Sequence, residues 1–118
     1  MFTAQVTAFS QASFTKGNIV VVQVGDGTAS LSGNGTATFL KEYTTSGTAV
    51  QSISLPTTIN GANKRLVLSG TATSEGALAR SVDFKYLTVA GYDAEVGTAN
   101  ITTSTSSTIN RTIARIKI

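Results

Sequence analysis

Residues 18–43, NIVVVQVGDGTASLSGNGTATFLKEY, give the clearest indication of the fold class. An apolar, β-branched run is followed by a glycine-marked turn, a Thr/Ser-rich connection and a second strand that begins at Thr38. Residues 85–118, KYLTVAGYDAEVGTANITTSTSSTINRTIARIKI, follow the same order, and their last strand begins at Thr112. Two copies of a strand-loop-strand unit predict repeated sheets, in which each unit needs neighbours to cover its apolar faces.

The remaining segments also carry strand and turn signals. Residues 50–55 alternate between two faces and stop at Pro56, which cannot donate a ladder hydrogen bond. No window has the 3.6-residue period of a helix, and β-branched residues dominate throughout. We therefore expect an all-β fold of antiparallel sheets from a duplicated strand-loop-strand unit, either propeller-blade-like or sandwich-like.

The chain length of 118 residues fits a single domain. We expect one all-β module over residues 1–118, with a leading, exchangeable strand in residues 1–17, a first unit in residues 18–56 and a second unit in residues 57–118.

Three segments allow more specific expectations. Residues 18–24 carry apolar side chains on both faces, which predicts a central strand that is covered on both sides. Residues 97–107 are nearly all Thr, Ser, Ala and Asn, which predicts an exposed loop or a β-arc with polar faces. The C-terminal RTIARIKI places Arg111, Arg115 and Lys117 on one face, and cations along a terminal strand oppose unwanted pairing at its edge.

The start of the chain forms a clean amphipathic pattern. Phe2, Ala4, Val6 and Ala8 alternate with Thr3, Gln5 and Thr7. One interpretation is a first strand of the module's own sheet. The other is a strand that leaves its module and completes the sheet of the next subunit by β-augmentation, and head-to-tail contacts of this kind can build an open filament.

The composition excludes much catalytic chemistry. The chain has no histidine and no cysteine, which removes Ser-His-Asp triads, His-based metal sites, thiolate ligands and disulfides. Asp93 and Glu95 are two residues apart and could hold Ca²⁺ or act as an acid/base pair, but Gly91 and Gly97 beside them favour a solvated turn. We therefore expect no enzyme, no cofactor and no metal site.

Two tyrosines are candidates for ligand contact. Tyr86 and Tyr92 are evenly spaced on one expected strand, so both side chains lie on the same face. They could form a platform for a glycan or small ligand, or they could serve as core or cross-strand partners.

Charge indicates which partners to expect. Only 13% of the residues are charged, against roughly 25% in an ordinary soluble domain. The nine cationic residues are spread along the chain, with Lys64-Arg65 the only adjacent pair, so we do not expect nucleic-acid binding. No apolar run is long enough for a membrane span. A hydroxyl-rich surface with little charge repulsion favours association with copies of the same chain.

Residues 74–93, SEGALARSVDFKYLTVAGYD, resemble the blade motif of bacterial secreted β-propeller-like proteins, which typically carry a Ser-x-Asp-Gly-Arg-Tyr-Leu core. Residues 39–48 and 50–56 resemble the outer hairpin of such a blade, so the similarity covers most of the chain after Lys16. A blade is a scaffold and not a catalytic signature, so the resemblance transfers no functional residue.

The chain departs from that family in two ways. Phe84 and Lys85 stand where the family usually has Gly and Arg, which alters the turn after Asp83. Only about two blades are present, whereas a closed propeller needs roughly four or more. The missing blades could come from identical chains that close a ring, from the rest of a longer protein, or be replaced by a sandwich that stacks into a fibre.

The expected function is that of a non-enzymatic structural module, extracellular or on the cell surface, that assembles with copies of itself into a filament or other homo-oligomer. The alternative is a ring-closing propeller subunit or fragment that binds a small ligand or glycan. A lactonase-like propeller enzyme is a third interpretation, disfavoured because only six acidic residues could supply its chemistry. The N-terminal residues do not have the charged and apolar regions of a signal peptide.

Overall fold

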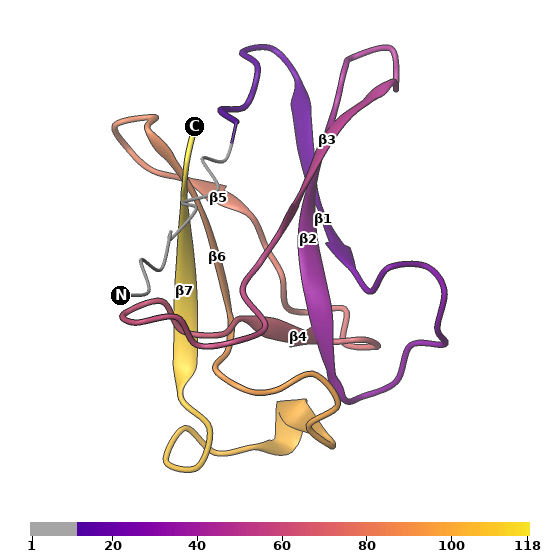
Figure 1. The fold of residues 1–118 in the computed structure, drawn as a ribbon, viewed down its shortest axis with the longest axis vertical. Helices are drawn as coiled ribbons and strands as arrows, with labels where there is room; N and C mark the ends of the chain where they lie inside the picture. The colour runs from indigo at the N-terminus through magenta and orange to yellow at the C-terminus, as the bar shows by residue number, and fades with distance from the viewer. Residues whose placement is uncertain (1–11) are drawn as a thin grey trace, which may run out of the picture.

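The computed structural model describes residues 12–118 and shows an antiparallel all-β protein, as the sequence predicts (Figure 1). Seven strands and one short 3₁₀ helix follow one another along this part of the chain: β1 (Ile19–Val24), β2 (Gly35–Tyr43), β3 (Ala49–Ser54), β4 (Val67–Ser69), β5 (Ala79–Arg80), β6 (Tyr86–Tyr92), η1 (Ile101–Thr103) and β7 (Arg111–Lys117). No helix within these residues is long and apolar enough to span a membrane.

Both copies of the predicted strand-loop-strand unit are antiparallel pairs. The first copy pairs β1 with β2 from Ile19 opposite Tyr43 to Val24 opposite Thr38. The second copy pairs β6 with β7 over the full length of both strands. The connection within the first copy begins at Gly25, which has a positive φ of 78° that suits glycine. The duplicated unit is therefore confirmed.

The strand β2 shares its second side between two partners. Residues 39–43 of β2 pair with β3, and residues 35–37 pair with β4. The strand β6 is divided in a similar way, because β5 pairs near one end and β4 meets Tyr92 at the other. β4 therefore joins the two long hairpins, and Figure 1 shows β1, β2 and β3 on one side of the molecule and β6 and β7 on the other.

The curled sheet encloses one apolar core and carries a smaller cluster outside it. The main core is formed by buried side chains from both hairpins and their connections: Phe14, Leu40, Leu55, Leu66, Leu68, Val89 and Ile116. The second cluster joins Val67 and Ala94 to Ile101, which is completely buried. The Thr/Ser-rich segment is thus a loop, and its one helical turn is held in place by an isoleucine.

One local expectation is wrong. β1 is not a central strand, because in the described part of the chain it pairs with β2 alone. Its inner-face valines pack against the core, but Ile19 and Val21 on the other face are 50% and 42% exposed. Apolar residues on both faces therefore mark a strand whose outer face is uncovered. The alternation expected along β7 is confirmed, with Arg111, Arg115 and Lys117 exposed and Ile116 buried.

Candidate functional site

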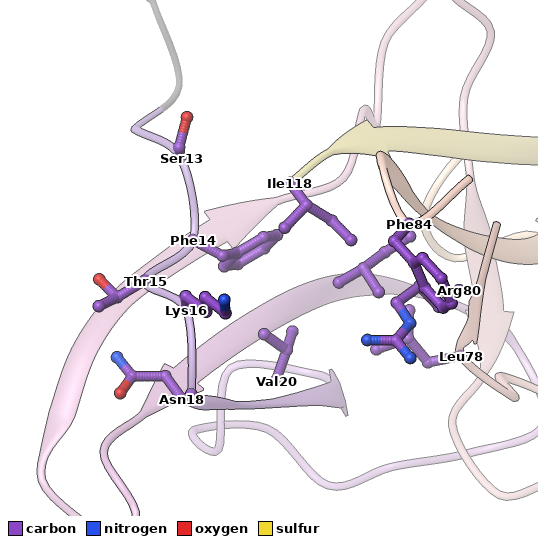
Figure 2. Close-up of a pocket in the computed structure, with 12 residues that line it drawn as sticks. Ser13, Phe14, Thr15, Lys16, Asn18, Val20, Leu78, Arg80, Phe84 and Ile118 are labelled. Atoms are coloured by element: carbon purple, nitrogen blue, oxygen red, sulfur yellow. The ribbon is translucent and has the colours of Figure 1, made fainter. Parts of the chain in front are cut away.

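A groove lies where the curled sheet stays open (Figure 2). β1 and β5 are the two ends of the main strand order, and residues from both line this groove of about 520 Å³. The lining comes from the segment before β1, from β1 itself, from the β5 and β6 region and from the C-terminus: Ser13, Phe14, Thr15, Lys16, Gly17, Asn18, Val20, Leu78, Arg80, Phe84, Leu87 and Ile118.

The interior of the groove is apolar and its rim carries two cations. Phe14, Val20 and Ile118 point toward one another across it in Figure 2. Lys16 and Arg80 are exposed residues of the same lining. Such a surface can receive apolar side chains, and it offers positive charge only at its margin.

A buried carboxylate fixes the segment that leads into β1. Glu42 of β2 is fully buried, and its Oε1 accepts hydrogen bonds from the Thr15 backbone N–H at 2.7 Å and from Asn18 Nδ2 at 2.8 Å. Its Oε2 accepts a hydrogen bond from Gln51 Nε2 at 2.6 Å. These donors, with that of Gln51 foremost, lower the pKa of Glu42 although desolvation opposes the shift. One carboxylate therefore ties the groove's wall to β2 and β3.

The opposite wall contains a residue in an unfavourable backbone conformation. Phe84 has φ of 59° in the turn between β5 and β6, a left-handed conformation that favours glycine. Asp83 closes this turn by accepting hydrogen bonds from Ser81 Oγ at 2.6 Å and from the Lys85 backbone N–H at 3.2 Å. The Phe84 side chain is 63% exposed, and Arg80 lies 4.3 Å from its ring centroid. A strained, exposed aromatic residue beside a groove is typical of a functional surface.

The backbone of β1 adds a second feature to this site. The Gly25 N–H donates to Ala37 O at 2.8 Å, so the alternation of an antiparallel ladder directs Ile19, Val21 and Gln23 toward β2. The N–H and C=O groups of Val20, Val22 and Val24 point away from β2, and no described residue pairs with them. The site is therefore an apolar groove next to an open strand edge.

The predicted assembly residues Phe2, Ala4, Val6 and Ala8 lie outside the described residues, so their role stays a prediction. The predicted ligand platform, Tyr86 and Tyr92, is on one face of β6. Arg115 lies 4.7 Å from the ring centroid of Tyr86, and Arg111 lies 4.5 Å from that of Tyr92. Each ring thus already has a cationic partner on one face, and ligand binding there also stays a prediction.

Asp93 and Glu95, the two neighbouring acids, both form ion pairs with Arg65. Asp93 Oδ1 is 2.9 Å from Arg65 Nε, and Glu95 Oε1 is 3.6 Å from Arg65 Nη1. Within residues 12–118, no group of three or more acidic, histidine or cysteine side chains has the arrangement of a metal site. The arrangement of Asp93 and Glu95 is that of an ion pair that joins the segment before β4 to the end of β6.

Glu75 is a further residue whose role the sequence did not reveal. It accepts hydrogen bonds from the Ser69 backbone N–H at 2.5 Å and from Tyr92 Oη at 2.8 Å. Desolvation first, and then the nearby Glu75, raise the pKa of the Tyr92 hydroxyl. Residues 72–76 form neither a helix nor a strand, and the Glu75 carboxylate within them braces β4 against β6.

The sequence does not mark Phe14, which lines the groove, or Glu42, which holds the groove's wall from β2. Phe14 stands outside any alternating run, and Glu42 is a charged residue near the end of a strand, where exposure is the ordinary expectation. Phe84 had a signal, because it follows Asp83 in an expected turn, where glycine is common. No family model, curated protein or solved structure matches this chain.

Proposed function

We propose that this chain is a non-enzymatic structural module that assembles with copies of itself through β-strand contacts into a filament or other homo-oligomer. The observation that carries the proposal is the open edge of β1, whose outward residues Ile19 and Val21 are apolar and half exposed. An unprotected apolar edge strand is a ready template for another strand. The proposed extracellular or cell-surface location rests on the resemblance to bacterial secreted proteins.

Two further observations support association. The groove beside β1 is lined by apolar side chains, and filling it would remove them from water at roughly 25 cal/mol per Å² of apolar surface. The chain carries a net charge of only +3, so copies repel one another weakly.

The proposal is tested by removing the leading amphipathic segment. We expect the chain without residues 1–9 to be a soluble monomer by light scattering, while the full chain forms larger particles. Val6→Asp places a charge on the apolar face of that segment, and Thr7→Asp is the matched control on its polar face. Continued assembly of both the truncated chain and Val6→Asp would overturn the proposal.

The alternative is a ring-closing propeller subunit or fragment that binds a small ligand or glycan. The observation that favours it is the groove itself, where the aromatic residues Phe14 and Phe84 and the cations Lys16 and Arg80 line one open hollow. Negative-stain images distinguish the two proposals. Closed particles with a small, fixed number of chains support the ring, and particles of indefinite length support the filament.

A further inference from the structure

We propose that the free edge of β1 and the groove beside it form the acceptor for residues 2–8 of a second copy of this chain. This inference rests on the proposed self-assembly and adds the place where the incoming strand binds. In the acceptor, the strand would pair with β1 and cover the apolar wall between β1 and β5.

The backbone of β1 provides the pairing groups. Val20, Val22 and Val24 direct three N–H donors and three C=O acceptors away from β2, and residues 12–118 provide no partner for them. The six residues of β1 extend over ~20 Å, and the seven residues 2–8 would extend over ~24 Å. The incoming segment is therefore long enough to pair along the whole of β1.

The side-chain pattern of residues 2–8 fits the two sides of the acceptor. On the inner side, Val20 and Val22 pack against the core, and Leu78 and Leu87 continue the apolar surface across the groove. An incoming strand that continues the sheet would direct Phe2, Ala4, Val6 and Ala8 to this side. Thr3, Gln5 and Thr7 would then face solvent, as the alternation of a strand requires.

Charge distinguishes the edge of β1 from that of β7. β1 carries no charged residue, and neither do residues 2–9. The free edge of β7 presents Arg111, Arg115 and Lys117, and the groove between β3 and β7 is lined by Lys64, Arg115 and Lys117. Pairing at β7 would place these cations on the strand next to an incoming segment that has no carboxylate, whereas Lys16 and Arg80 of the β1 groove lie off β1 itself. Charge therefore favours β1 over β7 as the acceptor.

Phe84 gives independent support for a function of the opposite wall. Its left-handed backbone conformation is unfavourable in a residue with a side chain, and glycine would avoid that cost. Its ring lies largely exposed beside the groove with the Arg80 guanidinium over it. An aromatic ring held there at such a cost fits a contact with an incoming apolar strand.

The absence of native cysteine makes cross-linking a direct test. Gln5→Cys and Val21→Cys, on separate chains, are mixed and oxidised, and Gln5→Cys with Ile113→Cys is the matched control on the outer face of β7. Both acceptor positions are exposed, so the substitutions leave the core intact. We expect a disulfide-linked heterodimer as the main oxidised product of the first mixture and little from the control. Thr7→Cys with Ile19→Cys is the second pair if either variant folds poorly.

Other products would overturn the inference in identifiable ways. A cross-link within one chain of the Gln5→Cys/Val21→Cys double variant, without dimer, would show that the leading segment pairs with its own module. A Val21→Cys homodimer would show edge-to-edge pairing of β1. Particles that form without a cross-link to β1 would overturn the acceptor but leave self-assembly standing. A chain that stays monomeric at all concentrations would overturn both proposals.

Discussion

β1 and β7 occupy equivalent places in the two hairpins but present opposite edges. Each pairs along its length with one long strand, β2 or β6, and buries part of its inner face in the same core. β7 directs its exposed cations Arg111, Arg115 and Lys117 outward, whereas β1 directs the apolar Ile19 and Val21 outward. Within residues 12–118 the backbone leaves both edges unpaired, so the two edges differ in their outward side chains and not in their hydrogen-bonding groups.

The largest effect on stability is expected in the core that both hairpins share. Leu40 of β2 is completely buried, so Leu40→Ala should reduce the free energy of unfolding by ~2–5 kcal/mol. Urea denaturation should show one transition for both hairpins. The control Ile113→Ala, at a residue that is 71% exposed on β7, should change stability by less than ~0.5 kcal/mol. Two separate transitions would show that the hairpins fold independently.

A single cation should make the edge of β1 resemble that of β7. Val21→Lys places an ammonium group on the outer face of β1, where pairing would partly desolvate it. We expect the concentration at which particles appear in light scattering to rise about tenfold or more, which corresponds to ~1.4 kcal/mol per contact. Ile113→Lys makes the same change on β7 and should leave assembly nearly unchanged. Equal effects of the two substitutions would remove the distinction between the edges.

Acidification should weaken the hydrogen bonds through which Glu42 holds the segment before β1. The folded-state pKa of Glu42 lies below the ordinary value of 4.5, so its stabilisation is present above that value and is lost as the pH falls through the folded pKa. The urea midpoint should therefore fall on acidification. Glu42→Gln should lower the midpoint at neutral pH and flatten this dependence, because an amide nitrogen cannot accept the hydrogen bond from Gln51. Glu95→Gln, at an exposed side chain, is the control. An unchanged acid dependence in Glu42→Gln would contradict this role.

Alkaline pH should weaken the contact between Tyr92 of β6 and Glu75. The raised pKa of Tyr92 means that its contribution is present below the ordinary value of 10.0 and is lost as the pH rises through the folded pKa. Tyr92→Phe removes the hydrogen bond to Glu75 and should cost ~1 kcal/mol in urea denaturation at neutral pH. Tyr86→Phe is the control on the same face of β6, since no described residue hydrogen-bonds the Tyr86 hydroxyl. Equal losses in both variants would argue against the Glu75 contact.

The smallest effect on stability is expected at Phe84, in the wall of the groove opposite β1. Phe84→Gly should relieve ~1–2 kcal/mol of backbone strain and lose ~0.5–1 kcal/mol from the contact with Arg80, for a net gain of stability below ~1.5 kcal/mol. The same variant should assemble less readily, because the aromatic ring beside the groove is gone. Phe84→Asn, which also tolerates this conformation, is the second variant. A loss of stability in both would mean that the ring serves the fold rather than the groove.

The sequence predicts where the strands lie along the chain better than it predicts which of their faces other segments bury. Glycine-marked turns and alternating apolar residues predict both hairpins. The cations on one face of the last strand predict that this face is exposed, and it is. Apolar residues on both faces of β1 predict a central strand. The prediction is wrong because alternation reports which face a residue occupies and not whether anything lies over that face. The exposure of Ile19 and Val21 depends on which strands pair, and this is decided far away in the chain.

The candidate site was less predictable because its contacts join distant residues. Glu42 binds Thr15 and Asn18, which lie 27 and 24 positions earlier, and Arg65 pairs with Asp93, 28 positions later. Local composition also hid Ile101, the one large apolar residue between Gly97 and Thr108, which anchors a loop of small polar residues. These roles arise from packing across the sheet, and a pattern read along the chain does not contain them.

The narrow link at β4 has a mechanical consequence. Only the pair Val67 and Tyr92 joins the ladder of β4 to that of β6, whereas β1 with β2 and β6 with β7 are each paired over six or seven positions. A force that pulls the two hairpins apart would therefore be resisted mainly by the apolar core that they share and by the backbone hydrogen bonds that join Gly33 and Gly35 to the loop between β6 and β7, rather than by the β4 ladder.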